Sequence, residues 1–153
     1  MRGLALSAVA LLGACASTPT PDQSVAAIEN AVVRACPVER RQDGAHAQGF
    51  GATAGVRIED VALVPTAADP TRAVRLRRIT VAPGGVIAWH EHATIQGFAV
   101  LVSGEMVELR NTCLDPITYR AGDVAIEDAN TAHSWRNEGD APAVVLVSHF
   151  VTR

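Results

Sequence analysis

Histidine is the residue type whose spacing in this sequence most clearly suggests chemistry. His90 and His92 stand two positions apart in a segment rich in apolar and β-branched residues. Residues i and i+2 of a β-strand point to the same face, so both imidazoles can face one site. A metal ion shared by two such histidines needs a third donor from another strand, and His133 is the candidate. Imidazole nitrogen suits divalent transition metals, so the three histidines predict a metal site.

The segments around these histidines resemble the two motifs of the cupin superfamily. The matching residues of the first motif are Gly84, His90, His92 and Gly104, and those of the second are Gly122, His133 and Asn137. The resemblance covers roughly residues 74 to 151. It implies an all-β fold, a small antiparallel jelly-roll barrel, with a metal ion or a small-molecule ligand in its mouth. The metal would be iron, manganese, zinc, nickel or copper, which imidazole ligands do not distinguish.

The sequence departs from the cupin pattern at one ligand. The first cupin motif carries a glutamate four or five positions after its second histidine, and here Gln96 or Gly97 falls there. The resemblance therefore implies three neutral imidazole ligands with Gln96 as a weak oxygen ligand. Such a centre should hold a divalent ion less tightly than one that includes a carboxylate.

Four further residues are weaker candidates for the pocket. Trp135 and Asn137 share the strand parity of His133, which would place them on the pocket wall, although core packing is the default for a tryptophan. His149 lies in an apolar run, so we expect a buried or edge histidine rather than a ligand. We expect Glu127 to face solvent; the alternative is that its carboxylate returns to the pocket.

Three arginines, Arg75, Arg77 and Arg78, cluster on one predicted strand. An inward arginine could bind a carboxylate through two parallel hydrogen bonds, but the expectation for such a cluster is a solvated face. Trp89 has the opposite parity to His90, so we expect it to pack outside the barrel or at a dimer contact.

The elements that must position these residues are short strands separated by turns. We predict strands at 56–64, 73–82, 86–93, 98–109, 117–120, 123–127, 132–137 and 143–151. Glycine, proline and aspartate mark the breaks, such as Pro83-Gly84-Gly85 and Ser103-Gly104. About eight strands at this spacing indicate a sandwich or a closed barrel. The barrel is expected to span 56–153.

A helix and a loop are predicted ahead of the barrel, in residues 25–55. Val25, Ile28, Val32 and Ala35 fall at helical spacing, which predicts a short helix. Residues 37–55 contain a proline and four glycines, so we expect a loop there. Cys36 and Cys113 are expected to form a disulfide in an oxidising compartment; the alternative is two separate buried thiols.

The first residues have the composition of an export signal. In residues 1–14, Arg2 precedes an apolar stretch that is too short to span a bilayer, as in a secretory signal peptide. The run from Leu12 to Cys15 resembles the bacterial lipobox, whose cysteine is lipid-modified after cleavage; the alternative is an ordinary signal peptide with Cys15 incidental. Residues 15–24 would then form a polar, proline-containing tether. These features predict a periplasm-facing lipoprotein of the bacterial cell envelope, with Ala16 favouring the outer membrane.

Composition and charge narrow the possible partners. The net charge is −3, no basic run occurs, and only 4% of residues are aromatic, so a nucleic-acid partner is not expected. No nucleophile triad and no pair of glycosidase-type acids is evident, so any reaction would depend on a metal. We expect a small-molecule ligand, membrane contact only through the lipid anchor, and either a monomer or a homodimer.

Three functions remain open at this point. The first is an exported, lipid-anchored cupin that binds a divalent metal through His90, His92 and His133 and a small molecule in the barrel mouth. The second is an Fe(II) dioxygenase-like oxidoreductase, because thiol dioxygenases of the superfamily also use three histidines without the glutamate. The third is a metal-free ligand-binding or envelope module. Whether the protein is an enzyme is left open.

Overall fold

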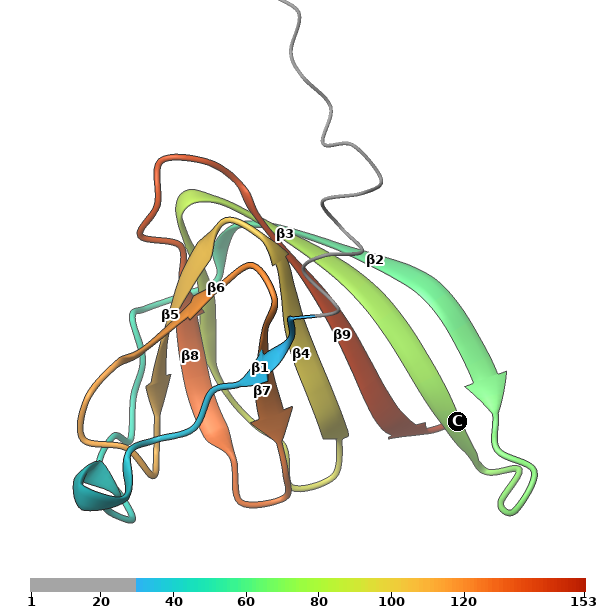
Figure 1. The fold of residues 1–153 in the computed structure, drawn as a ribbon. Coiled ribbons are helices and arrows are strands. Elements are labelled where there is room, and N and C mark those ends of the chain that lie inside the picture. The colour runs from blue at the N-terminus through green and yellow to red at the C-terminus, as the bar shows by residue number, and fades with distance from the viewer. Residues whose placement is uncertain (1–29) are drawn as a thin grey trace, which may run out of the picture.

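The structure is a computed structural model and describes residues 30–153 (Figure 1). The signal peptide, Cys15, the tether and the first part of the expected helix lie outside the described residues. Within residues 30–153, no helix is long and apolar enough to cross a membrane.

Nine strands and one short 3-10 helix make up the described chain. The strands are β1 (Val32–Val33), β2 (Ala54–Pro65), β3 (Arg72–Glu91), β4 (Gln96–Ser103), β5 (Glu105–Arg110), β6 (Ile117–Arg120), β7 (Asp123–Glu127), β8 (Ala132–Arg136) and β9 (Ala143–Thr152), and the 3-10 helix is Val38–Arg40. Their order in the sheet is β1-β7-β4-β9-β3-β8-β5-β6, with β2 paired to β3. The fold is therefore all-β, as predicted.

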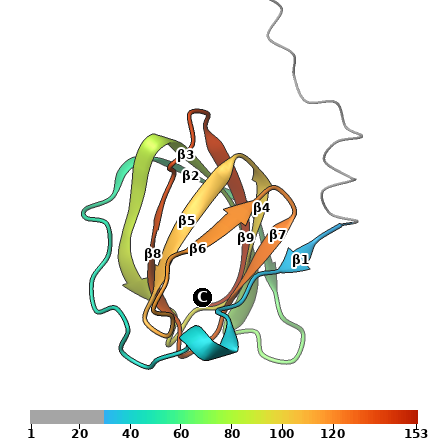
Figure 2. The same ribbon diagram turned by 60° about the vertical axis from the view of Figure 1, so that its left-hand side comes forward.

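The sheet curls into a half-barrel (Figures 1 and 2). All of its pairs are antiparallel except β1 with β7. Strand β9 shows how the curl sorts side chains, because its buried and less buried residues alternate. Val145, Val147 and His149 face the interior, whereas Phe150 is 49% exposed. The core is formed chiefly by Val81, Ala99, Leu101, Met106, Ile117, Tyr119, Ala125, Trp135, Val145 and Val147.

The long strand β3 joins two strands that were predicted to be separate. Pro83-Gly84-Gly85 bends the strand without ending it, and Gly84 takes a φ of +71° that favours glycine. The first part of β3 pairs with β9 and the last part with β8. One strand therefore carries both the arginine cluster and the first histidine of the metal motif. In contrast, Gly104, with a φ of +82°, divides the predicted strand 98–109 into β4 and β5.

The helix expected up to Ala35 is not present in its described part. Val32 and Val33 instead form β1, and the amide of Val32 donates to the carbonyl of Gly122 at 3.0 Å. Arg34 adds an ion pair with Asp123 at 2.9 Å. β-branched valines fit an extended edge strand at least as well as a helix, and pairing with β7 decides between the two.

A disulfide joins this N-terminal segment to the barrel. Cys36 and Cys113 are bonded, with their Cα atoms 5.6 Å apart, and both are buried. The carbonyl of Arg40 accepts a hydrogen bond from the amide of Leu114 at 3.0 Å, next to the bridge. The predicted disulfide is confirmed.

Candidate metal centre

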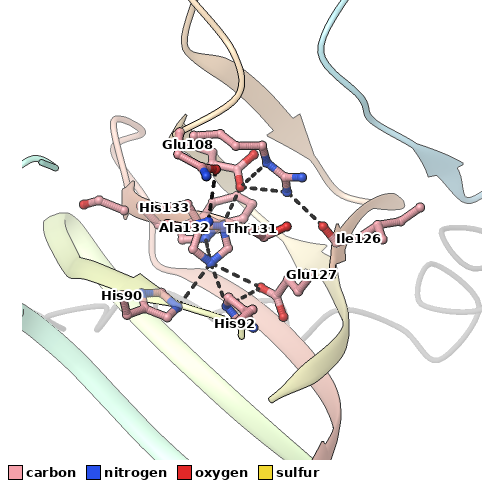
Figure 3. Close-up of polar contacts among 12 residues, drawn as sticks. His90, His92, Glu108, Ile126, Glu127, Thr131, Ala132 and His133 are labelled. Atoms are coloured by element: carbon pink, nitrogen blue, oxygen red, sulfur yellow. Dashed lines mark hydrogen bonds and ion pairs between the residues drawn. The ribbon is translucent and has the colours of Figure 1, made fainter. Parts of the chain in front are cut away.

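Three histidines from two strands converge on one point (Figure 3). His90 lies near the end of β3, His92 one residue beyond it, and His133 on β8 directly across from His90. The Nε2 atom of His133 is 3.1 Å from Nε2 of His90 and 3.0 Å from Nε2 of His92. The structure thus brings together the three residues that the sequence predicted to share a site.

The outer nitrogen of each ring has a hydrogen-bond partner. Nδ1 of His90 donates to the carbonyl of Ala88 at 2.9 Å, and Nδ1 of His92 donates to the carbonyl of Ile95 at 2.8 Å. Nδ1 of His133 donates to Oε1 of Glu108 at 2.5 Å. Carbonyl and carboxylate oxygens only accept, so each Nδ1 carries the hydrogen, and a ring in its neutral form presents an unprotonated Nε2 to the centre.

This arrangement of nitrogen atoms fits a divalent cation. Three unprotonated Nε2 atoms cannot hydrogen-bond to one another, whereas a metal ion with M–N bonds of 2.0–2.1 Å spaces tetrahedral nitrogens about 3.3 Å apart. The observed separations of 3.0 and 3.1 Å are close to that spacing. Burial lowers the pKa of His90 and lowers that of His92 to about 4. The neutral form, which binds metals, is therefore favoured near neutral pH.

Glu108 on β5 holds His133 from behind. Its side chain is fully buried and also accepts hydrogen bonds from the Tyr119 hydroxyl at 2.8 Å and from Nε of Arg110 at 3.0 Å. Burial opposes ionisation, but the hydrogen bond from His133 and the charge of Arg110 hold the pKa of Glu108 below its usual range. Sequence reasoning missed this residue. Its one signal is a carboxylate between the apolar residues Val107 and Leu109.

Glu127 faces the three histidines, so the expectation that it faces solvent is wrong. Its side chain is 4% exposed, and Oε1 lies 3.7 Å from Nε2 of His133 and 4.0 Å from Nε2 of His92. Oε2 accepts a hydrogen bond from Nε2 of His149 at 2.5 Å. In β7 the small Ala125 points into the core and the larger Ile126 points outward. Residue size suggests the opposite arrangement, which would have turned Glu127 to solvent.

Strand β4 explains how Glu127 comes to stand here. Gly97 pairs with Glu127 on one side and with His149 on the other. A Cβ atom at Gly97 would lie 1.8 Å from the carbonyl oxygen of Ser148, so this backbone admits no side chain there. Gln96 has the outward parity of Phe98, is exposed, and lines a depression on the outer surface. The carboxylate that is absent from β4 is thus supplied by the neighbouring strand.

Two of the three remaining pocket candidates line the cavity, and the third does not. Trp135 lines the cavity beside the histidines, with Nε1 3.4 Å from Nε2 of His133. His149 also lines it, and its ring centroid lies 5.2 Å from that of His92. Asn137 is fully buried but serves the turn after β8, where its amide donates to the carbonyls of Val81 and Ala141 at 2.9 Å. It does not line the cavity.

The cavity in front of the histidines has a volume of about 420 Å³. Its apolar wall includes Ile79, Ile87, Met106, Trp135, Val145 and Val147. Trp89 also lines it, contrary to the expected outside position, because a register irregularity between Ile87 and His90 interrupts the alternation of β3. Arg75 and Arg77 line the same cavity, so they do not belong to a solvated face, whereas Arg78 is exposed.

Comparison with known proteins supports the cupin superfamily. Residues 77–149 match the family described as "Cupin domain". The chain is similar to the solved structure of KdgF from Halomonas sp., at 16% identity and a TM-score of 0.53, over 74% of this chain and 93% of that one. It is also similar to a Cupin 2 conserved barrel domain protein from Salinispora arenicola CNS-205, at 19% identity and a TM-score of 0.50, over 61% of this chain and 74% of that one. No curated protein sequence matches.

Proposed function

We propose that this cupin-domain protein is an exported, lipid-anchored protein that binds a divalent transition metal through His90, His92 and His133 and a small molecule in the adjoining cavity. One observation carries the metal assignment. Nε2 of His133 lies 3.0 and 3.1 Å from Nε2 of His92 and of His90, and every Nδ1 is engaged elsewhere. Glu127 stands beside this group and would offset part of the charge of the ion.

The chain's own residues would prepare this centre in three ways. Glu108 holds the His133 ring in the Nδ1–H form, and the backbone carbonyls of Ala88 and Ile95 do the same for His90 and His92. Trp135 and the aliphatic wall limit the access of water on one side. A bound divalent ion would polarise an oxygen or nitrogen atom of the small molecule.

The dioxygenase hypothesis stays a prediction, and Glu127 weakens one of the arguments for it. It depended on three histidines without a carboxylate, and Glu127 lies within 4.0 Å of two of the Nε2 atoms. No other contact of the described residues favours oxygen chemistry over a different use of the metal.

The envelope location is supported by the sequence of residues 1–24 and by the cysteines. The Cys36–Cys113 disulfide accords with an oxidising compartment. We therefore propose a periplasm-facing lipoprotein anchored at Cys15 in the outer membrane. Fractionation of cells that produce the chain or its Cys15→Ser variant tests this: we expect the chain in the outer membrane and the variant in soluble fractions. The same fraction for both would contradict the anchor.

Metal analysis of the full chain tests the metal assignment. The protein is produced by export, purified without an affinity His-tag, and analysed by mass spectrometry for iron, manganese, zinc, nickel and copper. We expect near-stoichiometric metal in the native chain and loss of it in the His90→Ala/His133→Ala variant. His46→Ala, which changes a histidine outside the cluster, is the matched control and should keep the metal.

Two outcomes of the metal analysis would contradict the proposal. A folded native chain that takes up none of these metals even on reconstitution, or a double variant that retains its metal, overturns the three-histidine centre. The first of these outcomes would favour a metal-free ligand-binding module.

A further inference from the structure

We propose that the small molecule bound in this cavity carries a carboxylate group, and that Arg75 binds it. The inference deepens the proposed function, because it names the class of ligand that would reach the histidines. The assignment of Arg75 nevertheless depends on contacts of its own, which do not involve the three histidines.

Arg75 is placed beside the centre by the pairing of β3 with β9. It lies directly across from His149, the residue that hydrogen-bonds Glu127, and Arg77 lies across from Val147. Both arginines have the inward parity of Ile79 and line the cavity that His90 and His92 line. A ligand in this cavity can therefore contact the arginine face and the histidine face together.

Arg75 has an unused hydrogen-bond donor. Its Nε atom is buried and has no hydrogen-bond partner among the described residues. A buried donor without an acceptor destabilises the fold, and native proteins carry few of them. Burial and the charge of Arg77 also hold the pKa of Arg75 below its usual value, and the charge of Asp60 offsets them only in part. Both observations favour a bound anion.

Of the two arginines, only Arg77 has an ion-pair partner among the described residues. Arg77 donates from Nε to Oδ1 of Asp60 at 2.9 Å, which gives it a partner. Of the two glutamates that line the cavity, Glu127 accepts from His149 and Glu91 is exposed. The Arg75 guanidinium, which forms no ion pair with a described residue, thus remains for the carboxylate of a ligand. Its planar fork matches the two oxygens of a carboxylate.

The rest of the cavity limits the size and polarity of this ligand. Its volume of about 420 Å³ lies in the range for small-molecule sites, and Ile58, Ile79 and Val147 line it near the arginines. The expected ligand is a small organic acid with an apolar portion. Its carboxylate would lie at Arg75 and a second polar atom would face the histidines.

Titration calorimetry with a defined panel tests the proposal. The probes are the carboxylates acetate, pyruvate, malonate, glutarate and benzoate, the uncharged amides acetamide, malonamide and benzamide, and inorganic phosphate. Each is titrated into the full chain, zinc-loaded and EDTA-treated. We expect at least one carboxylate to bind at least tenfold more tightly than the amides, and Arg75→Gln to lower that affinity at least tenfold.

Two variants of the same strand control for charge and geometry. Arg78→Gln removes an exposed arginine of opposite parity and should change the affinity less than twofold. Arg75→Lys keeps the charge but loses the planar fork, so its affinity should fall between those of the native chain and Arg75→Gln. The proposal is overturned if no carboxylate binds better than its amide, if Arg75→Gln binds as the native chain does, or if phosphate alone binds.

Metal content separates this proposal from the metal assignment. Arg75→Gln should keep as much zinc as the native chain, because Arg75 contacts none of the three histidines through a hydrogen bond described here. If the chain takes up no metal but its EDTA-treated form binds a carboxylate through Arg75, the metal assignment fails and this inference stands. If zinc binds and no carboxylate does, this inference alone fails.

Discussion

The two buried glutamates on either side of the histidines have different surroundings. Glu108 accepts hydrogen bonds from His133, Tyr119 and Arg110, so both of its oxygens are engaged. Glu127 accepts one from His149, and its other oxygen faces Nε2 of His133 at 3.7 Å. Glu108 contacts the outer nitrogen of a histidine, whereas Glu127 faces the inner ones. Glu108 orients the His133 ring, whereas Glu127 stands beside the candidate metal site.

This difference makes the two sides of the centre separable by mutation. Changes around Glu108 should lower stability and metal affinity together, because the same contacts hold the barrel and the His133 ring. Changes at Glu127 should affect the metal more than the fold. Glu108→Ala and Glu127→Gln test that separation directly, and the largest loss of stability is expected at Glu108.

Removing the Glu108 carboxylate should be the most damaging change. Glu108→Ala leaves the donors of His133, Tyr119 and Arg110 without their acceptor, and breaking such a buried ionic cluster costs about 3–5 kcal/mol of unfolding free energy. Metal affinity should also fall about 10- to 100-fold because the His133 ring is no longer held. Urea denaturation and chelator competition measure the two effects. Glu105→Ala, on the same strand but at a surface ion pair with Arg120, should cost about 1 kcal/mol or less.

Adding one methyl group at Gly97 should disturb the other side of the centre. In Gly97→Ala the Cβ would lie 1.8 Å from the carbonyl oxygen of Ser148, so β4 and β9 must separate. We expect a loss of about 2–4 kcal/mol, seen as a lower melting temperature. In Gly139→Ala the new Cβ would lie 3.3 Å from Asn137 Oδ1, and the loss should be smaller. Equal melting temperatures for both variants would contradict the close approach at Gly97.

Acidification should destabilise the metal-free protein well above the usual pKa of a carboxylate. The pKa of His92 falls from 6.5 to about 4 on folding, chiefly through burial. Between these values the unfolded chain binds a proton that the folded chain does not, so the free energy of unfolding decreases as pH falls from 6.5 to 4. We expect a loss of about 2–3 kcal/mol over this window, measured in EDTA by urea denaturation. A His92→Gln variant should show a flatter profile; an equally steep one would assign the effect to other groups.

Neutralising Glu127 should have the smallest effect on the fold. Glu127→Gln keeps the shape and an oxygen that can accept from His149, so we expect about 1 kcal/mol or less of lost stability. Metal affinity should fall about tenfold, because the remaining ligands are uncharged. Chelator competition against Glu91→Gln, which neutralises an exposed carboxylate of the same cavity, isolates this effect. An unchanged affinity would mean that Glu127 only anchors His149.

Much of the fold was predictable because the strands carry local signals. Turn residues and alternating apolar residues located β6 and β7 at their observed bounds, and the cysteines predicted the disulfide. The kink at Gly84 was mistaken for a strand end because proline and glycine mark bulges and turns alike. The prediction of a helix up to Ala35 was wrong because pairing with the neighbouring strand decides whether Val32 and Val33 are helical or extended.

The site was predictable where spacing alone determines which residues meet. His90 and His92 share a face through their separation, and the second motif places His133 across from them. Spacing alone does not place the other three residues of the site. The positions of Glu108, Glu127 and Arg75 depend on which strands are neighbours and on which alternate residues of a strand face the core. The sequence analysis expected Glu127 and Arg75 to face solvent because charged residues are usually exposed. In this barrel both are drawn inward by strands whose inward parity is set by Ala125 and Ile79.

The disulfide also determines how the protein would carry mechanical tension. A pull on the chain ahead of Val32 would first load the two-residue pairing of β1 with β7, which is the weaker element. The covalent bond at Cys36 would then pass the force directly to Cys113, across a sequence separation of 77 residues. The chain between the two cysteines carries Arg75, Arg77, His90 and His92, and the force would bypass it. Tension from the N-terminal side would therefore be borne by a cross-link without stretching the strand that holds the first two histidines.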